Sequence, residues 1–582
     1  MKKSNFIVLY LCFHFIFSVT NNRADVIVVA ESGGHYTSVQ AAIDHASAGD
    51  SILVREKSTP YFEKINFDHG GDATNGYITL MAYPGEHPIL DGSGVPNNPA
   101  SYTDDMIYLE NVSYVRIIGF EIRNVNTPEG SGIRVYGYGS YIEIRDNEIH
   151  EIRGGAQDGG AMGITIYGAD DNRSINHLII DGNHIHDCDP AWSEALTLNG
   201  NVEQFEVTNN LIEDVNNIGI DFIGGEDWLS SRFARNGRCA WNQVYRANSS
   251  YGGGWAAGIY VDGGQDIIIE NNVVSECDLG IEIGAENQNV VTTGITVRNN
   301  IIYKNDKAGL VFGGYDVNTG RVKNCVFTGN TCYQNDVQHQ GLGELWIQYA
   351  EENELYNNIF YANDQNVLLY SESGNVNNLL DYNLWYAEAG ENSASWTWNN
   401  RHYSSFSGYQ AGSGQDAHSF FADPLFTDAA QADFHLSSAS PAVDAGSPTF
   451  IPADDERDMD HENRLAGSRV DVGADELQPT SAAHEAEPTP NVFELLSIYS
   501  NPFNNETQIR FQIDKAGKVE LAVYDLGGKK IRQLINRFQA AGTFVLRWNG
   551  RDDQNRICPS GAYFVTLEIN GQKRAQKALL IR

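Results

Sequence analysis

The chain has 582 residues, a formal net charge of -37 at pH 7 and a sequence pI near 4.6. A surface this acidic repels the phosphates of DNA and RNA, so nucleic acid is excluded as a partner. An acidic polymer would bind only through a local basic patch or a bridging cation.

Residues 1–22 have the layout of a secretory signal peptide. Lys2 and Lys3 precede an apolar run from Phe6 to Phe17, and small and polar residues follow up to Asn22. We expect the mature chain to begin near residue 23 and to be exported. Because no later run reaches about eighteen apolar residues, we expect no membrane span.

A short helix is predicted after this segment, capped by Thr37 or Ser38. Its apolar side chains fall at positions i, i+3, i+4 and i+7, in order Val39, Ala42, Ile43 and Ala46. We expect this helix to cover the open end of a repetitive β structure, because unpaired strand edges there would polymerise.

The repeat is marked by an asparagine that is followed two residues later by an apolar residue. It recurs at Asn147, Asn183, Asn210, Asn242, Asn272, Asn300, Asn330, Asn358 and Asn383. The period and the short β-branched runs predict a solenoid with one coil per repeat, in which each asparagine bonds those above and below it. We place Gly119 in the same slot one coil earlier. The predicted fold is all-β, a right-handed parallel β-helix.

Seven five-residue strands align between residues 163 and 348. They are GITIY at 163, ALTLN at 195, GIDFI at 219, GIYVD at 258, GIEIG at 280, GLVFG at 309 and ELWIQ at 344. The second and fourth residues are apolar in every strand. Period-2 alternation therefore turns these residues into the coil and the first, third and fifth residues outward.

Three carboxylates then share one outer wall of successive coils: Asp221, Asp262 and Glu282. Coil and residue spacings predict Cα separations of roughly 8 Å from Asp221 to Asp262 and roughly 10 Å from Asp221 to Glu282. Like charges this close raise at least one pKa, which places an acid beside a base.

Such a pair suits glycosidic hydrolysis, in which one carboxyl protonates the leaving oxygen and the other activates water. We assign these roles to Asp221 and Asp262, with Glu282 tuning them and no cofactor required. Glycine pairs at 224, 263 and 313 would clear room for a polymer. Further candidates for substrate binding are Glu194, Asn199, Trp192, Tyr260, Glu286, Tyr315, Trp346, Arg235 and Lys307. We expect the rings of Trp192, Tyr260, Tyr315 and Trp346 to lie on or beside this face and to stack on sugar rings.

Two other functions fit the same residues. In a lyase acting on a uronic-acid polymer, the four carboxylates Asp221, Asp262, Glu282 and Glu286 would hold Ca²⁺. Lys307, Lys304 or Arg235 would then remove the proton. In a noncatalytic adhesin the solenoid would bind glycans without cleaving them, and the outward acids would be solvated. A polysaccharide is the expected partner in every case, and we expect a monomer.

Residues 226–255 contain four arginines and three tryptophans and are predicted to leave the solenoid as a long loop. The motifs SPAVDAGSP and SRVDVGADE resemble the closing segment at the ends of β-helix proteins. The mature chain keeps six cysteines without metal-binding spacing, which we expect to be buried: Cys188, Cys239, Cys277, Cys325, Cys332 and Cys558.

The tail differs in charge from the solenoid. From residue 491 onward, Lys and Arg number fourteen and Asp and Glu number eight. Short strands such as TQIRFQI, KVELAVYDL and GAYFVTLEI predict a small β-sandwich. The segments SNPFNNETQIRFQI, VELAVYDLGGKKIRQL and KALLIR resemble the immunoglobulin-like C-terminal sorting domain of type IX secretion. This resemblance implies delivery by the secretion machinery to the cell surface or medium.

The solenoid resembles the pectate-lyase-like superfamily of parallel β-helices over most of residues 27–475. That superfamily includes lyases, hydrolases, epimerases and adhesins, and the NTDG and RIK motifs of polygalacturonases do not occur here. The resemblance therefore specifies the fold better than the reaction. The predicted layout is a signal peptide at 1–22, the capped β-helix at 23–475, a linker at 476–491 and the sorting domain at 492–582.

Overall fold

The computed structural model describes residues 24–95, 104–154, 159–229 and 231–478, and in the tail 494–499, 507–513, 517–525, 528–539, 542–548, 550–552, 556, 558–569 and 572–580. The predicted signal peptide and linker lie largely outside these residues. The chain divides into two compact units, residues 1–478 and 479–582, which we describe separately.

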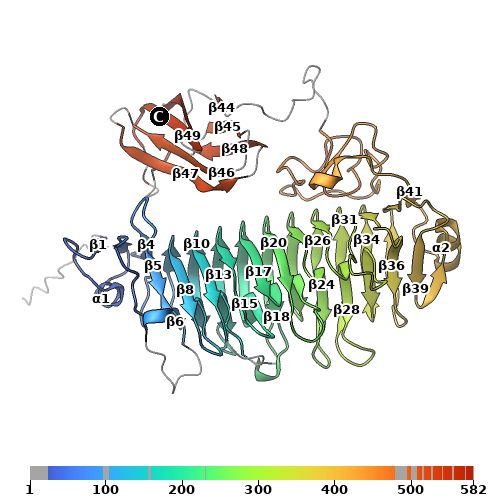
Figure 1. Cartoon of the computed structure of the whole chain (residues 1–582), viewed down its shortest axis with the longest axis horizontal. Helices are drawn as coiled ribbons and strands as arrows, with labels where there is room; N and C mark the ends of the chain where they lie inside the picture. Colours follow the sequence, from blue (N-terminus) through green and yellow to red (C-terminus); the bar gives the residue numbers. More distant parts are fainter. Residues whose placement is uncertain are drawn as a thin grey trace, which may run out of the picture. The chain divides into compact units, whose positions relative to one another are not determined.

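The first unit is a parallel β-helix whose coils each add one strand to three sheets, A, B and C (Figure 1). All neighbouring strands in these sheets are parallel, except for the terminal hairpin of the C sheet. The predicted β-helix is therefore confirmed.

The C sheet carries the predicted wall. Its strands are β3 (Ile65–Phe67), β6 (Ile107–Glu110), β9 (Ile133–Tyr136), β12 (Ile164–Gly168), β15 (Glu194–Gly200), β18 (Ile218–Ile223), β21 (Ala257–Asp262), β24 (Leu279–Ala285), β28 (Ala308–Gly314), β32 (Leu345–Gln348), β36 (Val367–Ser371), β39 (Ser395–Trp398) and β40 (Arg401–Tyr403).

The A sheet follows the C sheet in each coil. Its main path is β1 (Val26–Val29), β2 (Ser51–Val54), β4 (Ile78–Ala82), β7 (Val115–Ile118), β10 (Gly139–Arg145), β13 (Ile175–Asp181), β16 (Val202–Thr208), β19 (Arg235–Ala240), β22 (Gln265–Glu270), β26 (Thr296–Arg298), β30 (Val326–Thr328), β34 (Glu354–Tyr356) and β37 (Leu379–Asp381). Beside this path lie β25 (Val291–Thr293), β29 (Arg321–Lys323) and β33 (Ala350–Glu351).

The B sheet completes each coil. Its strands are β5 (Ile89–Asp91), β8 (Glu121–Val125), β11 (Glu148–Ile152), β14 (His184–His186), β17 (Leu211–Asn216), β20 (Gln243–Asn248), β23 (Val273–Ser275), β27 (Ile301–Tyr303), β31 (Thr331–Tyr333), β35 (Ile359–Tyr361), β38 (Leu384–Tyr386) and β41 (Phe420–Phe421).

Apolar side chains from the three sheets fill the interior of the coils. In the C sheet the inward residues pair in register, as Ile220 does with Ile259 and Ile259 with Ile281, and all three are fully buried. Each such side chain stabilises the fold by about 1.5 to 3 kcal/mol relative to exposure. The alternation that buries these residues fixes which residues face outward.

The asparagine column forms as predicted. Asn272 is buried, and both its backbone N–H and its side-chain Nδ2 donate to Asn300 Oδ1, at 2.9 and 3.0 Å. Its Nδ2 also donates to the carbonyl of Cys239 at 3.0 Å. The column ends at Asn383, whose backbone N–H donates to Ser419 Oγ at 2.7 Å.

The assignment of Gly119 to this column is wrong. The backbone N–H of Phe120 donates to Asn147 Oδ1 at 3.1 Å, so Phe120 occupies the slot. Gly119 lies one residue earlier, where the backbone is left-handed with φ of 83°. Because this coil has phenylalanine in place of asparagine, the asparagine repeat could not identify its slot.

Two shorter columns were not predicted. Asn305 donates to Asn335, whose Nδ2 donates to Glu344 Oε2 at 2.6 Å. Asn353 donates to Asn378 Oδ1 at 2.9 Å in another column. Both satisfy buried backbone groups where coils turn, which is the function of the long column.

Both ends of the stack are covered. Helix α1 (Val39–Ile43) begins after Ser38, whose Oγ accepts the backbone N–H of Ala41 at 3.2 Å, and it buries Val39, Ala42 and Ile43 as predicted. At the other end, helix α2 (Phe406–Ser413) packs with the hairpin of β39 and β40 through Trp396 and Tyr409, whose rings stack at 5.8 Å.

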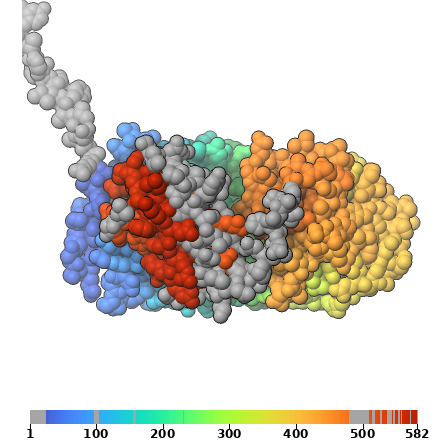
Figure 2. Space-filling model, turned by 90° about the horizontal axis from the view of Figure 1, so that it is seen from above, coloured from blue at the N-terminus to red at the C-terminus, as the bar shows by residue number. Residues whose placement is uncertain are grey.

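The motifs expected to close the end of the solenoid lie along its flank instead. The segment from β42 (Phe426–Asp428) through η3 (Ala429–Gln431) and β43 (Asp433–Leu436) to residue 478 folds back along the later coils, drawn in orange in Figures 1 and 2. Arg464 Nε donates to Asn299 Oδ1 at 3.0 Å, which fixes the segment to a coil corner. Its arginine and acidic side chains therefore bind buried polar groups of the flank.

The long loop predicted at 226–255 is also wrong, because β19 and β20 lie inside it and complete a normal coil. Gly237 occupies an inward position of β19, where an added Cβ would lie 2.1 Å from the ring of Phe205. Phe205 thus fills the space that an apolar side chain at position 237 would occupy. Because position 237 is glycine, the alternation of apolar residues did not predict this strand. The true connections are residues 224–234, with η2 (Asp227–Leu229), and residues 249–256.

The second unit packs two antiparallel sheets around one core. One sheet contains β44 (Glu494–Tyr499), β45 (Thr507–Ile513) and β48 (Gly542–Trp548); the other contains β47 (Lys530–Gln539), β46 (Gly517–Tyr524), β49 (Gly561–Ile569) and β50 (Gln572–Leu580). Phe511 and Val565 meet in the core, which confirms the predicted small β-sandwich.

Cys188, Cys239, Cys277, Cys325, Cys332 and Cys558 are free and buried, as expected. Short helical segments of the first unit include η1 (Gly92–Gly94). Within the described residues, no helix has the length and apolar character needed to cross a membrane.

The asparagine column is tested by Asn272→Ala. The change leaves the amide of Asn242 and the carbonyl of Cys239 without their buried partner, so the free energy of unfolding should fall by about 2 to 4 kcal/mol. Chemical denaturation measures it. The exposed Asn318→Ala is the control, and an equal effect in both variants would contradict the role of the column.

Candidate active site

The predicted register of the outer wall is confirmed by the strand pairing. Thr197 pairs with Asp221, Asp221 with Tyr260, and Tyr260 with Glu282, on four successive strands of the C sheet. The column continues through Val311 to Trp346. Asp221 and Glu282 are therefore two coils apart in one column, with Tyr260 between them.

A second outward column lies two residues further along the strands. Asp262 pairs with Gly284, and Asn199 pairs with Ile223. Asp262 therefore lies one coil and two residues from Asp221, as the sequence predicted. Glu194 opens β15 in register with Ile218, at the other edge of the wall.

Three carboxyls of the wall are buried, although they face away from the coil interior, and Glu282 is partly buried. Asp221 is 2% exposed and Asp262 is 6% exposed, and Glu194 is also buried. Outward acids were expected to be solvated if they had no function. These three groups therefore occupy an environment that disfavours charge.

The connections that follow β18 and β24 pack beside the wall. An added Cβ at Gly200 would lie 3.0 Å from the Trp228 ring, so η2 packs over the end of β15. Asn287 Nδ2 donates to Glu226 Oε1 at 2.9 Å, which joins the connection after β18 to the one after β24. The first connection was predicted only as part of a longer loop.

Tyr260 is a positioning residue. Its hydroxyl donates to Glu286 Oε1 at 2.9 Å, and the backbone N–H of Glu286 donates to Asp262 Oδ1 at 2.8 Å. The ring packs over Gly284, where an added Cβ would lie 2.8 Å from it. Because only 4% of Tyr260 is exposed, its predicted role as a stacking platform is wrong.

Burial and mutual repulsion raise the pKa of each wall carboxyl. Burial raises the pKa of Glu194 to about 8, and burial with the charges of Glu286 and Asp262 raises the pKa of Glu282 to about 8. Burial raises the pKa values of Asp221 and Asp262 well above the usual range, with Glu194 adding to the first and Glu286 to the second. No lysine or arginine is among the main contributors in the described residues.

Three buried polar atoms of the wall have no hydrogen-bond partner within the described protein: Thr197 Oγ1, Asn199 Oδ1 and Asp221 Oδ1. Thr197 and Asn199 are two residues apart on β15, and Thr197 pairs with Asp221 on the next strand. Each such atom costs about 1 to 3 kcal/mol when it stays unpaired. Their convergence on one patch matches a site for hydroxyl groups.

Aromatic side chains lie at the ends of the wall. Trp192 is 48% exposed and contacts Tyr251, and Tyr315 is 67% exposed. Trp346 is half-buried, with its ring centroid 6.0 Å from that of Trp255. Of the predicted stacking residues, these three keep surface available to a ligand, unlike Tyr260.

The two predicted basic residues take different positions. Arg235 lies on the A sheet, where its Nη2 is 2.9 Å from Glu203 Oε2, so it does not join the C-sheet wall. Lys307 is buried, with its Nζ 3.7 Å from the centre of the Trp255 ring. Burial lowers the pKa of Lys307. Lys307 therefore remains beside the wall and Arg235 does not.

The glycines expected to clear space for a polymer serve the backbone instead. An added Cβ at Gly313 would lie 1.5 Å from the carbonyl oxygen of Gln348, and one at Gly263 would lie 2.2 Å from that of Gly224. These positions need glycine because neighbouring coils approach closely. They give no information about the ligand.

Two residues of the site were not singled out from the sequence. Glu226 lies five residues after Asp221 and adds to the repulsion at Asp262, and Trp255 contacts both Lys307 and Trp346. Glu226 and Glu286 both lie just after the end of a wall strand, three residues after β18 and one residue after β24. That shared position was the available signal.

The carboxylates do not form a single cation site as they stand. Asp221, Asp262, Glu282 and Glu286 are suitable oxygen donors for Ca²⁺. Among the described residues, however, no three of these carboxylates bring ligand atoms within 4.8 Å of one another. The predicted four-carboxylate calcium set therefore does not fit this arrangement.

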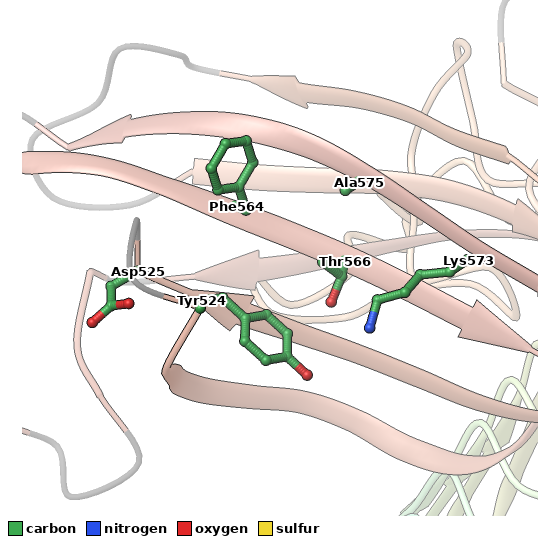
Figure 3. Close-up of a pocket in the computed structure, with 7 residues that line it drawn as sticks. Tyr524, Asp525, Phe564, Thr566, Lys573 and Ala575 are labelled. Carbon is green, nitrogen blue, oxygen red and sulfur yellow. The ribbon is translucent and has the colours of Figure 1, made fainter.

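A depression in the second unit lies among Tyr524, Asp525, Phe564, Thr566 and Lys573 on the four-stranded sheet (Figure 3). Lys573 Nζ lies 3.2 Å from Glu568, and Phe564 is exposed. It holds one carboxylate and no acid–base pair, so the C-sheet wall remains the candidate active site.

Comparison with known proteins identifies the family. The sequence model described as Right handed beta helix region matches residues 194–340 and 247–408. The uncharacterized protein YwoF of Bacillus subtilis is 34% identical over 414 residues, which cover 69% of this chain and 86% of YwoF. The chain belongs to the YwoF family. The right-handed β-helix predicted for this member of the YwoF family is confirmed.

More distant similarities have lower sequence identity. Pectate lyase PEL9 of Emericella nidulans is 26% identical over 153 residues, 25% of this YwoF-family chain and 34% of that protein. A lacto-N-biosidase from Eubacterium ramulus aligns with a TM-score of 0.41 at 15% identity, covering 63% of this chain and 64% of that one. A rhamnogalacturonan lyase aligns with a TM-score of 0.33 at 12% identity, and the alignment covers 61% of this chain and 84% of that one.

The raised pKa values predict how the stability of this YwoF-family protein depends on pH. Glu282 binds its proton more tightly folded than unfolded, so its contribution is fully present below about pH 4.3 and is lost as pH rises toward 8. In Glu282→Gln the fall in stability between pH 5 and 8 should be smaller by on the order of 3 kcal/mol.

Urea denaturation across this pH range measures the slope. The control is Glu354→Gln, an exposed residue of the A sheet. Parallel pH profiles for the native protein and Glu282→Gln would contradict the raised pKa.

Proposed function

We propose that this protein is a carbohydrate-active enzyme that hydrolyses glycosidic bonds of a polysaccharide, with Asp221 and Asp262 as its acid and base. The observation that carries the proposal is the Asp221 carboxyl. It is buried on the outer wall, its Oδ1 lacks a partner, and carboxylates surround it. A carboxyl in such a place holds a proton at neutral pH and can donate it.

Asp221 is assigned as the general acid, because burial and the charges of Glu194 and Asp262 favour its protonated form. It would protonate the glycosidic oxygen as the bond from that oxygen to the anomeric carbon breaks. Thr197 and Asn199 lie beside it with unpaired polar atoms that suit sugar hydroxyls.

Asp262 is assigned as the general base. The backbone N–H of Glu286 donates to its Oδ1, and this hydrogen bond favours the ionised form. Once Asp221 is protonated, one neighbouring negative charge is removed, so Asp262 can ionise. It would take a proton from the water whose oxygen bonds to the anomeric carbon.

The register supports an inverting reaction. One coil and two residues give a Cα separation of roughly 8 Å between Asp221 and Asp262. In inverting enzymes the carboxyl groups are about 6.5 to 9.5 Å apart, which leaves room for a water molecule between base and sugar, and this Cα separation is compatible with that distance. Glu282, whose pKa is also raised, would adjust the charge around Asp262.

A lyase reaction is the second candidate, favoured by the similarity to a pectate lyase and by Lys307. The lowered pKa of Lys307 suits a general base. Its Nζ donates to the carbonyl of Gly253, and the wall carboxylates do not fit one Ca²⁺ as arranged. Hydrolysis therefore agrees better with the wall.

Product analysis on a panel of neutral and uronic-acid glycans tests the proposal. Hydrolysis gives reducing ends and products that have gained water, and EDTA should not change the rate. Elimination gives unsaturated, ultraviolet-absorbing products, and an adhesin binds glycans and yields neither product. Either of these last two outcomes would overturn the proposal.

The assignment of acid and base is tested by Asp221→Asn and Asp262→Asn. Each should lower kcat by about 10²- to 10⁴-fold, because a positioned proton transfer is lost. Asp266→Asn is the matched control, since Asp266 is exposed at a turn position of the A sheet. Full activity in either wall variant with an unchanged circular dichroism spectrum would exclude that residue.

We further propose that residues 1–22 direct export and that residues 492–582 act as a type IX sorting domain. The sandwich fold and the excess of basic residues in the tail support this role. A chain that lacks residues 492–582 should accumulate inside the outer membrane of a host with that machinery. Cell fractionation measures this, and normal secretion of the shortened chain would contradict the proposal.

A further inference from the structure

A histidine pair lies on the B sheet, on another face of the solenoid from the carboxylate wall. His184 and His186 are two residues apart on β14. In the B sheet β14 pairs with β17 on one side and with β11 on the other, and β8 follows β11; β8 and β17 are labelled in Figure 1. In a strand this spacing turns both imidazoles to the same side. Glu148 of β11 pairs with His184 and adds a carboxylate.

The three side chains converge. One nitrogen of His184, one nitrogen of His186 and one oxygen of Glu148 all lie within 4.8 Å of one another. His186 Nε2 is 3.4 Å from Glu148 Oε1 and makes no hydrogen bond. Two ligands of a tetrahedral zinc ion, each about 2.0 to 2.2 Å from the metal, are separated by roughly 3.4 Å.

Each histidine also contacts a carboxylate from outside this group of three. His184 Nε2 lies 3.1 Å from Glu213 Oε1, and His186 Nδ1 lies 2.8 Å from Asp187 Oδ2. Histidines that ligate metals commonly have such a carboxylate partner, which fixes the ring and makes the free nitrogen more basic. The outer contacts of a metal site are therefore in place.

The site also has access to solvent. The side chains of Glu148 and His184 are 52% and 35% exposed, so an ion can enter. Three protein ligands leave the fourth tetrahedral position for water. Phe434 of the folded-back segment contacts Tyr303 and Tyr333 on β27 and β31 of the same sheet. The histidine pair lies on β14, several coils earlier than these contacts.

A second group of potential ligands provides an internal comparison. His435, Asp460 and Asp475 also converge within 4.8 Å. Both nitrogens of His435 are already bonded to carboxylates, Nδ1 to Asp433 and Nε2 to Asp460. Unlike His186, whose Nε2 makes no hydrogen bond, His435 is held on both sides as a cation in an ion-pair cluster, and an imidazolium has no lone pair for a metal.

We propose that Glu148, His184 and His186 form a binding site for a divalent transition-metal ion of the zinc class. Two imidazoles and one carboxylate are the ligand types that such ions prefer. The site is separate from the proposed hydrolytic wall and does not depend on that function.

Isothermal titration of metal-free protein, residues 24–582, with Zn²⁺ tests the proposal. The native chain should bind Zn²⁺, and each of the variants His184→Ala, His186→Ala and Glu148→Gln should bind it at least tenfold more weakly. Glu213→Gln changes no ligand and should weaken binding by about 10- to 100-fold, because it removes the partner that orients His184. Glu148→Gln and Glu213→Gln keep the histidine rings, so they test the site if a histidine variant misfolds.

Two matched variants serve as controls. His418→Gln removes a histidine elsewhere on the solenoid, and His435→Gln removes the alternative group; neither should change Zn²⁺ affinity. Co²⁺ bound to the native chain should give the intense visible absorption of tetrahedral coordination, which His186→Ala should lose. Absence of binding by the native chain, equal binding in the three ligand variants, or loss of binding in His435→Gln would overturn the site.

Discussion

The structure depends on holding successive coils in register, and the buried asparagine column is the interaction that does so at one corner. Asn272 shows the pattern: its Oδ1 accepts two N–H groups of Asn242 in the preceding coil, and its Nδ2 donates to the carbonyl of Cys239 in that coil and to Asn300 Oδ1 in the following coil. A slip of one residue would leave these groups unpaired inside the protein. It would also turn every wall residue to the opposite side of its strand.

Register explains how the chain can hold acids in surroundings that oppose charge. A single strand could not bring Asp221, Asp262 and Glu282 together, but three stacked strands place them on one outer face. Their repulsion and burial reduce stability, and the interior columns of Ile, Val and Leu compensate for this. A rigid scaffold that tolerates such a cost is what proton-transfer chemistry requires.

The fold was largely predictable because its signals are periodic. The asparagine column, the inward pairing of Ile220 with Ile259 that period-2 alternation predicts, and the cap at Ser38 all follow from spacing that elementary geometry fixes. Prediction failed where one residue compensates for another over a long distance. Gly237 hides a strand because Phe205 of the previous coil fills its place.

The site was less predictable than the fold, because it depends on how connections pack. The sequence placed the wall carboxyls on one face but could not show that Asp221 and Asp262 are buried, or that η2 packs over the end of β15 and that Glu226 and Asn287 join two connections. It also could not show that Tyr260 turns onto Gly284 and Glu286 and leaves its ring unavailable. The histidine pair on β14 was missed because its third ligand comes from a strand 36 residues earlier.

The central claim is that Asp221 carries a proton at neutral pH. Infrared difference spectroscopy between the native protein and Asp221→Asn reports this group directly. The account predicts the carbonyl band of a neutral carboxylic acid at pH 7, which disappears only in more alkaline solution. The paired bands of an ionised carboxylate at pH 7 would contradict it.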